Sequence, residues 1–222
     1  MEDYRTDEEQ VEALKRWWDE NGKSTLVMIA LAVVVSFGWR YWQDQQQAHK
    51  EAAASVYQEL LTLMSAPMLD DSQRATAGTL ITQLTEQFDD TGYDHLASLA
   101  KARLAMDAGD FAAAASVLTA LSGEELGVEL AALVNLRLAK VQFSQQDYTA
   151  ALNTLKGDMQ KYAAQAAELR GDIYAAQGDA ASASAAYQES QTLTADSDML
   201  RPSPLLQIKI DAVASATTGE NA

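Results

Sequence analysis

Three charged side chains, Arg103, Lys140 and Asp172, are spaced so that they can share one binding surface. Each lies six residues before the first residue of a short turn segment, at 109–111, 146–148 or 178–180. Equivalent positions before equivalent turns lie on the same side of successive helices. Arginine and lysine there could clamp the carboxylates of a partner or hold an extended segment of it. The alternative is that each charge lies on a solvated helix face.

The other candidate chemical groups are adjacent acids and two isolated histidines, His49 and His95. The acid pairs occupy 70–71, 89–90 and 124–125, but in a chain with 32 acidic residues such pairs are typical of solvated loops. Two separated histidines cannot form a His-rich metal site, and the lack of cysteine excludes disulfides and thiolate chemistry. His95 follows an aspartate at an expected helix start, which favours a surface or capping role. We therefore expect no catalytic, metal or cofactor site.

Composition and charge indicate an all-α protein that does not bind nucleic acid. The 222 residues include 16 Lys and Arg against 32 Asp and Glu, so the net charge is -16. Such a chain repels phosphate backbones, because nucleic-acid affinity comes mainly from cations that neutralise phosphates. Forty-one alanines against three prolines and 11 glycines favour helices, because alanine loses no side-chain entropy in a helix.

The three turn segments predict stacked helical hairpins of the tetratricopeptide type. Their aspartates are 37 and 32 residues apart, which brackets the 34-residue period of these repeats. On both sides of each turn segment, small residues lie where the two helices must approach. In the second helix, a larger residue follows one helical turn after the small one and fills the next layer. These columns are Ala102, Ala139 and Gly171; Ala114, Ala151 and Ala183; and Leu118, Leu155 and Tyr187. Each turn aspartate is expected to cap the helix that follows it.

The repeat pattern is degenerate, which leaves an ordinary alanine-rich bundle as the alternative. The tyrosine expected four residues before each turn occurs only as Tyr174, with Ala105 and Gln142 at the other two positions. The small residue expected late in the second helix is replaced by Leu121 and Asp158. We therefore predict hairpins that are similar to tetratricopeptide repeats, with an additional hairpin ahead of them over 44–65 and 72–88. A capping helix is expected at 205–213, with a frayed end after Ala214.

One membrane span is predicted near the N-terminus, over 24–42. Residues 24–39 carry no charge and span about 24 Å, which is short of a hydrocarbon core of about 30 Å. The flanking residues supply the remaining length as membrane anchors: Lys23, Trp39, Arg40, Tyr41 and Trp42. The alternatives are a buried core helix and a cleavable signal peptide. Bulky residues at the end of the segment disfavour signal-peptide cleavage there.

The span divides the chain into three parts: a cytoplasmic tail over 1–23, the transmembrane signal anchor over 24–42, and an exported helical-repeat domain over 43–222. Lysine and arginine on the two sides favour a cytoplasmic N-terminus only slightly. The tail has an apolar face of Val11, Leu14 and Trp18, which predicts an interfacial helix or, alternatively, a recognition tail.

Five segments are similar to the YfgM family of ancillary subunits of the bacterial Sec translocon. They are QVEALKRWW at 10–18, ENGK at 20–23, GWRYW at 38–42, NLRLA at 135–139 and LRGD at 169–172. The resemblance implies a single-pass protein of the bacterial inner membrane, with a cytoplasmic N-terminus and a periplasmic domain of tetratricopeptide-like hairpins. It also implies association with the SecYEG channel and with a membrane-anchored, prolyl-isomerase-like periplasmic chaperone. It supplies no catalytic residues.

Two functions are consistent with these features. The first is a scaffold that links the channel to the chaperone and assists the handover of secreted proteins. The alternative is a holdase that binds unfolded translocated polypeptides directly, which requires an exposed apolar patch of several hundred Å². We expect the scaffold, because the positions predicted to line a partner-binding groove are charged: Arg103, Lys140 and Asp172.

Overall fold

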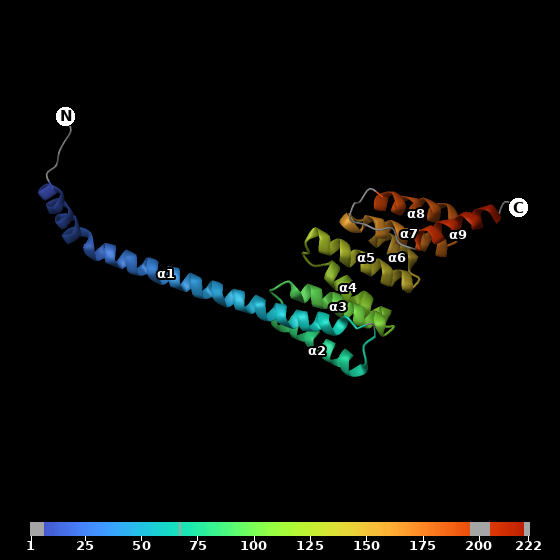
Figure 1. The fold of residues 1–222 in the computed structure, drawn as a ribbon, viewed down its shortest axis with the longest axis horizontal. Coiled ribbons are helices and arrows are strands. Elements are labelled where there is room, and N and C mark those ends of the chain that lie inside the picture. Colours follow the sequence, from blue (N-terminus) through green and yellow to red (C-terminus); the bar gives the residue numbers. More distant parts are fainter. Residues whose placement is uncertain (1–6, 67, 196–204, 220–222) are drawn as a thin grey trace, which may run out of the picture. The chain divides into compact units, whose positions relative to one another are not determined.

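The computed structural model describes residues 7–66, 68–195 and 205–219, and every regular element in these ranges is a helix (Figure 1). The chain forms two compact units, Met1–Ser55 and Val56–Ala222. The first helix, α1 (Asp7–Met64), crosses this division. Its membrane segment therefore belongs to the first unit and its last turns belong to the second.

The first unit contains a long apolar helix whose side chains are exposed. Within α1, an 18-residue window has a mean hydropathy of 1.6, and only 6% of that window is buried. In the described part of the chain, this is the one helix long and apolar enough to cross a membrane. A core helix of a soluble domain would be mostly buried, so the exposure of this segment is typical of a helix in contact with lipid.

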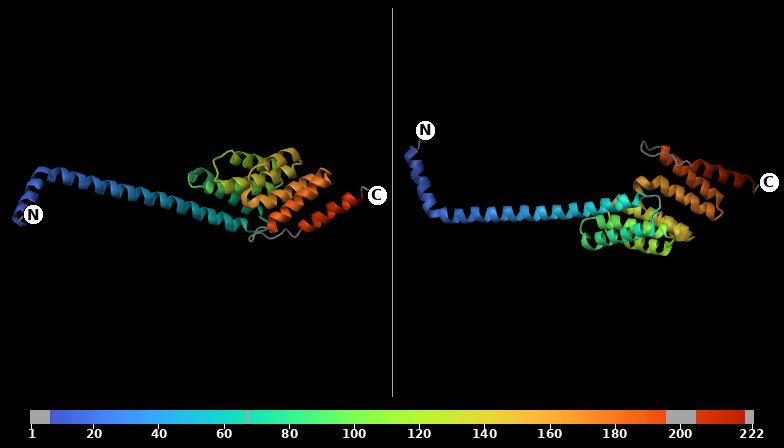
Figure 2. Two further views of the ribbon diagram at one scale, coloured as in Figure 1. Left: turned by 90° about the horizontal axis from the view of Figure 1, so that it is seen from above. Right: turned by 60° about the horizontal axis from the view of Figure 1, so that its bottom comes forward.

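The second unit is a stack of antiparallel helix pairs, shown side by side in Figures 1 and 2. Its first pair consists of the end of α1 and α2 (Asp71–Gln87), as expected for the hairpin ahead of the repeats. The next pairs are α3 (Tyr93–Asp107) with α4 (Phe111–Ser122), α5 (Val128–Ser144) with α6 (Tyr148–Thr154), and α7 (Ala163–Ala176) with α8 (Ala180–Ala195). A 3-10 turn, η1 (Gln160–Tyr162), precedes α7.

The last helix, α9 (Leu206–Gly219), packs on α8 and covers the end of the stack. It begins where the sequence predicts, and Leu206 and Val213 are buried against α7 and α8 in one cluster with Tyr187. The expectation that the chain frays after Ala214 is wrong, because the helix continues to Gly219. No proline or glycine interrupts 205–218, so nothing in that stretch stops the helix earlier.

The three turns close with the same backbone geometry. Gly109, Gln146 and Gly178 all have left-handed backbones, with φ of 76°, 63° and 79°. The next amide in each turn donates to a carbonyl five residues back, over 2.8 Å at Asp110, 2.9 Å at Asp147 and 2.9 Å at Asp179. The left-handed residue itself donates three residues back in each case. Together these bonds form the Schellman motif, which ends one helix while the next begins.

Each turn aspartate caps the helix that follows, as predicted. Its carboxylate accepts a hydrogen bond from the third residue of that helix, at 2.9 Å for Ala113, 3.0 Å for Ala150 and 3.0 Å for Ser182. The same principle applies to one of the acid pairs, because Asp70 caps α2 in a capping box with Gln73. These aspartates are therefore helix caps in the structure.

The small and large columns of the repeat pattern are buried at all nine positions. Leu118 and Leu155 fill the layers of the first two repeats, and Tyr187 fills that of the third. The third repeat has glycine in place of alanine at the facing position, and a Cβ on Gly171 would lie 2.3 Å from the Tyr187 ring. The predicted hairpin register is therefore confirmed, and the larger aromatic ring explains the one glycine in the small column.

Candidate functional site

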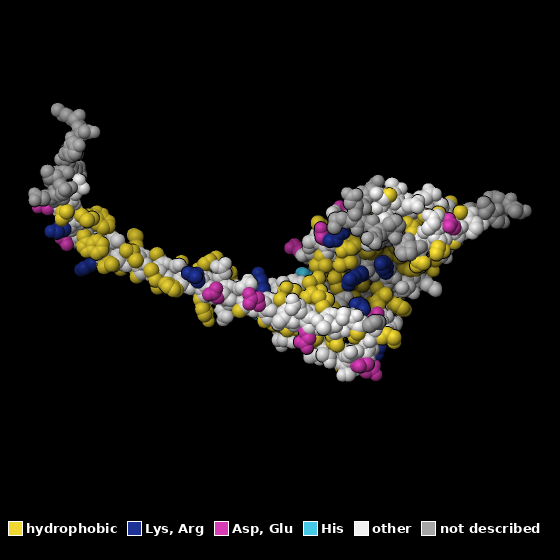
Figure 3. Space-filling view, viewed as in Figure 1, with side chains coloured by type: hydrophobic (Ala, Val, Ile, Leu, Met, Phe, Trp, Pro, Cys, Tyr) yellow, Lys and Arg dark blue, Asp and Glu magenta, His cyan; other side chains and the backbone are white. Residues whose placement is uncertain are grey.

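Arg103 of α3 and Lys140 of α5 line the same cavity, which has a volume of about 310 Å³. A third cation, Arg137, also lines it. Figure 3 shows lysine and arginine atoms gathered over a hydrophobic hollow on this face of the second unit. The cavity arises because α3 and α5 are the first helices of successive hairpins, which line the concave side of such a stack. Its apolar lining consists of Leu99, Ala102, Met106, Leu118 and Val141.

Sequence reasoning took one position from each repeat and therefore missed Arg137. A signal was present, because Arg137 lies three residues before Lys140 and residues at this spacing share a helix face. Burial is the main cause that lowers the pKa of Arg137, opposed by Tyr162 and Tyr57 and reinforced by Arg103. The guanidinium stays charged at physiological pH. Because Arg103 and Arg137 line one cavity, their like charges repel each other there.

The charges around the cavity are only partly balanced. Arg103 Nε lies 3.6 Å from Asp107 Oδ2, and Asp107 also lines the cavity. Both side chains of this pair are about half exposed, so the pair is weak. Within 7–66, 68–195 and 205–219, neither Arg137 nor Lys140 forms an ion pair. An anion in the cavity would therefore meet cations from both α3 and α5.

Aromatic residues lie beside Arg137. Tyr57, in the last part of α1, has its ring centroid 5.4 Å from that of Tyr93 in α3. Burial raises the pKa of Tyr57, and the Arg137 charge opposes that rise. The surroundings of Arg137 thus combine the charge of Arg103 with the aromatic side chains of Tyr57 and Tyr162.

The structure does not bring Asp172 together with Arg103 and Lys140. Its carboxylate accepts a hydrogen bond from the Tyr187 hydroxyl at 2.9 Å and forms an ion pair with Lys209 Nζ at 2.8 Å. Lys209 lies on α9 and also pairs with Glu168, at 2.8 Å. The capping helix therefore occupies the third predicted groove position, and Asp172 joins α7, α8 and α9.

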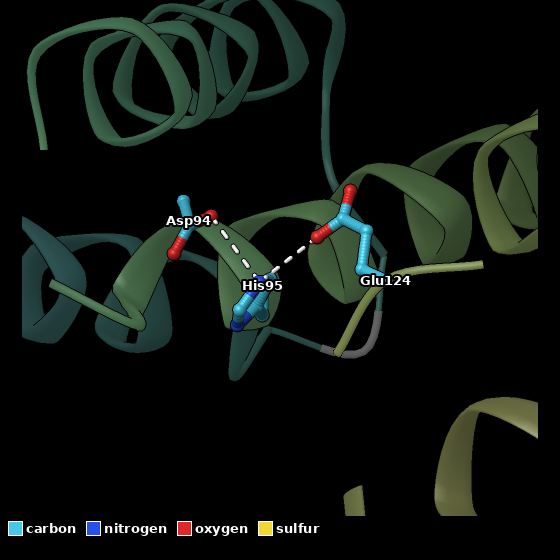
Figure 4. Close-up of side chains that lie close together, drawn as sticks. All are labelled: Asp94, His95 and Glu124. Carbon is cyan, nitrogen blue, oxygen red and sulfur yellow. Dashed lines mark ion pairs between the residues drawn. The ribbon is translucent and has the colours of Figure 1, made fainter. Parts of the chain in front are cut away.

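A second cluster of titratable groups joins the start of α3 to the segment between α4 and α5 (Figure 4). His95 Nε2 lies 2.9 Å from Glu124 Oε2 and 3.5 Å from Asp94 Oδ2. These three residues offer ligand atoms within 4.8 Å of one another. Asp94 Oδ1 is buried and has no hydrogen-bond partner among the described residues. The His95–Glu124 contact joins the segment between α4 and α5 to the start of α3.

The residues predicted to anchor the span are exposed on α1, where they are free to meet lipid headgroups. Trp39, Tyr41 and Trp42 are 53–69% exposed, and Lys23 and Arg40 are exposed as well. The rings of Trp39 and Trp42 are in contact, with centroids 5.2 Å apart. Exposed tryptophans of this kind are typical of membrane interfaces and uncommon on water-facing helices.

An exposed apolar helix joined to stacked hairpins with Schellman turns defines a class of protein, the membrane-tethered helical-repeat proteins. In agreement, residues 15–215 match the family described as tetratricopeptide repeat-like domain. The chain belongs to the family of ancillary SecYEG translocon subunits, which the similarities to curated relatives show.

Three relatives carry the name "Ancillary SecYEG translocon subunit". The chain is 34% identical to that of Haemophilus influenzae over 188 residues, covering 83% of this chain and 88% of the relative. It is 35% identical to that of Escherichia coli over 191 residues, covering 85% and 88%. It is 33% identical to that of Aggregatibacter actinomycetemcomitans over 188 residues, covering 83% and 88%. No solved structure matches the chain significantly.

Proposed function

We propose that this protein is an ancillary subunit of the Sec translocon and acts as a membrane-tethered scaffold. In this proposal α1 crosses the bacterial inner membrane once, residues 1–23 are cytoplasmic and residues 43–222 are periplasmic. The repeat domain links the SecYEG channel to a membrane-anchored, prolyl-isomerase-like chaperone and assists the handover of secreted proteins. The names of the relatives support the translocon as partner. The cavity lined by Arg103, Arg137 and Lys140 is the observation that carries partner binding.

The membrane anchors form part of this proposal. Lys23 would reach the cytoplasmic headgroups, and 39–42 would place aromatic rings and Arg40 at the periplasmic headgroups. Their exposure on α1 supports this placement. The anchors would keep the repeat domain close to the membrane, where a partner of the channel must work.

A holdase is the alternative, and the surface of the second unit favours the scaffold over it. Large apolar side chains that are exposed there lie on separate elements: on α1, the α1–α2 connection, α5 and the region of α9. Among the residues that the structure describes, they are Leu61, Met68, Val128, Leu205 and Ile208. Direct binding of unfolded clients calls for a contiguous apolar patch, whereas three cations line the cavity between α3 and α5.

Purification of the tagged full-length chain in mild detergent tests the partners, with co-eluting proteins identified by mass spectrometry. We expect channel subunits and a membrane-anchored chaperone, whereas their absence under conditions that preserve the channel would contradict the proposal. A photo-crosslinker at position 103 or 140 separates the two functions. Capture of one defined partner favours the scaffold, and a broad smear of nascent clients favours the holdase.

A phosphatase reporter fused after Ala222 tests the orientation. Alkaline phosphatase folds only after export, because its disulfides form in an oxidising compartment. We expect an active reporter in intact cells. An inactive reporter, combined with an active cytoplasmic reporter at the same position, would reverse the proposed topology.

A further inference from the structure

We propose that Asp94, His95 and Glu124 form a binding site for one zinc ion. The site joins the start of α3 to the segment between α4 and α5 (Figure 4). None of the three residues lines the cavity between α3 and α5, and the inference does not depend on the scaffold function. The sequence predicts no metal site because its two histidines are separated, but the structure brings two carboxylates to a single histidine.

The spacing of the ligand atoms is the first argument. Imidazole nitrogen and carboxylate oxygen bind zinc at about 2.1 Å, so two such atoms at a tetrahedral angle lie about 3.4 Å apart. His95 Nε2 lies 2.9 Å from Glu124 Oε2 and 3.5 Å from Asp94 Oδ2, which brackets that separation. One ligand atom from each residue lies within 4.8 Å of the other two. The Glu124 side chain is 49% exposed, so it can rotate and adjust these distances to one ion.

The charge of the cluster is the second argument. In the part of the chain that the structure describes, Asp94 and Glu124 form ion pairs with His95 and with no lysine or arginine. One imidazole carries at most a single positive charge, so two carboxylates beside it leave an excess of negative charge unless a cation binds. The sequence around the cluster has no cation to supply, because 75–100 and 104–136 contain nine acidic residues and no lysine or arginine.

An unpartnered oxygen of Asp94 is the third and independent argument. Asp94 Oδ1 is buried and accepts no hydrogen bond from any residue that the structure describes. A buried polar atom without a partner costs free energy, and an ion is one of the groups that can remove this cost. A metal ion bound to the Asp94 carboxylate would interact with the charge that its two oxygens share.

The types of ligand favour zinc over magnesium or calcium. One imidazole nitrogen and two carboxylate oxygens suit a first-row transition metal, whereas calcium takes six to eight oxygens and magnesium an octahedron of oxygens. Three protein ligands leave the fourth position of a zinc tetrahedron to water, which can enter because Glu124 is half exposed. A bound ion would hold the segment between α4 and α5 against the start of α3, so binding should add stability to this hairpin.

The test uses the full-length chain in detergent micelles, without a histidine tag and after removal of metal by a chelator. Competition with a chromogenic indicator measures zinc affinity and stoichiometry, in an excess of magnesium that occupies weak sites on the acidic surface. Cobalt(II) serves as a second probe, because its visible absorption reports the number and geometry of its ligands. Thermal unfolding followed by circular dichroism measures the added stability.

We expect one zinc ion per chain, and a loss of affinity of more than roughly tenfold in each of His95→Gln and Glu124→Gln. At free zinc about 100 times the dissociation constant, the Tm of the wild type should rise by about 5–10 °C. Glu124→Gln should lose this rise. The matched controls are Glu125→Gln, which removes the adjacent exposed acid, and His49→Gln, which removes the other histidine; both should bind zinc as the wild type does.

Four results would overturn the inference: no zinc binding at micromolar concentrations, several equivalent weak ions per chain, unchanged affinity in Glu124→Gln, or equal affinity for calcium. A loss in Glu125→Gln as large as that in Glu124→Gln would likewise reduce the site to general attraction by the acidic surface. Glu124 is exposed, so Glu124→Gln should fold normally and decides the outcome even if His95→Gln does not fold. Circular dichroism of each variant should show unchanged helicity.

Discussion

Replacing Gly171 with alanine should destabilise the third hairpin because of Tyr187. The added Cβ would lie 2.3 Å from Cε1, 2.4 Å from Cδ1 and 2.9 Å from Cζ of that ring. Real Cβ atoms essentially never approach other heavy atoms so closely, so the ring or a helix must move. The ring cannot move freely, because it is 2% exposed and its hydroxyl donates to Asp172 over 2.9 Å.

Two opposing effects set the size of the change. Overpacking of a core costs about 1–3 kcal/mol, and an overlap on this scale is at the upper end. Alanine also favours the helix by roughly 1 kcal/mol relative to glycine. The expected net loss is therefore about 2 kcal/mol in the free energy of unfolding, from the difference of these two effects. For a unit of this size that corresponds to a Tm lower by about 4–8 °C.

The effect of Gly171→Ala on the free energy of unfolding should have the opposite sign when leucine replaces Tyr187. The first two repeats already combine alanine with leucine, as Ala102 with Leu118 and Ala139 with Leu155. In the Tyr187→Leu background, Gly171→Ala should therefore stabilise by roughly 1 kcal/mol, from helix propensity alone. The double-mutant cycle should give a coupling energy of about 3 kcal/mol, which is large even for residues in contact.

Thermal and denaturant unfolding of the full chain in detergent, followed by circular dichroism, measures all four corners of the cycle. The matched control is Ala139→Gly in the second repeat, which should lose stability because it opens space instead of relieving an overlap. If Gly171→Ala changes the free energy of unfolding by the same amount in both backgrounds, the packing argument is refuted.

Three further predictions concern the turns and the capping helix. Gln146 has a left-handed backbone with φ of 63°, so Gln146→Gly should raise stability by about 1 kcal/mol; an unchanged Tm would contradict this. Asp110→Ala removes the cap of α4 and should cost roughly 1 kcal/mol, whereas Asp110→Asn should retain most of it in the same unfolding assay. Burial lowers the pKa of Lys209, but its hydrogen bonds to Asp172 and Glu168 outweigh burial and raise that pKa above the usual 10.5. The Lys209 charge therefore stabilises the fold below about pH 10.5, and this stabilisation is lost as the pH rises through the folded-state pKa. The free energy of unfolding should consequently fall less for Lys209→Met than for the wild type when the pH is raised through this range.

The hairpin register was predictable from the sequence because it depends on local chemistry. Each of its features corresponds to a residue type at a fixed spacing in the sequence: the left-handed turn residue, the capping aspartate, and the small and large columns. Asp110 illustrates this, because its type and position predict both the end of one helix and the start of the next. The relation between Gly171 and Tyr187 was not predicted, although both residues were identified, because ring overlap depends on three-dimensional distance.

The candidate site was predictable only in part. Arg103 and Lys140 line one cavity because they belong to neighbouring repeats with the same register. Asp172 has the same register but meets Lys209, which lies 37 residues further along the chain and reaches it through the capping helix. The contact of His95 with Glu124 likewise depends on how α3 packs beside the end of α4. Pairings over such separations have no periodic signal in a single sequence.

The hydrogen bonds that close each turn use main-chain atoms at both ends. The acceptor carbonyls belong to three different residue types: Ala105, Gln142 and Tyr174. The three N–H to O distances are nevertheless almost the same, at 2.8, 2.9 and 2.9 Å. Side chains at these positions can therefore drift during evolution while the hairpin geometry persists. A hairpin of this kind therefore tolerates substitution at the residue that supplies the acceptor carbonyl of its closing turn.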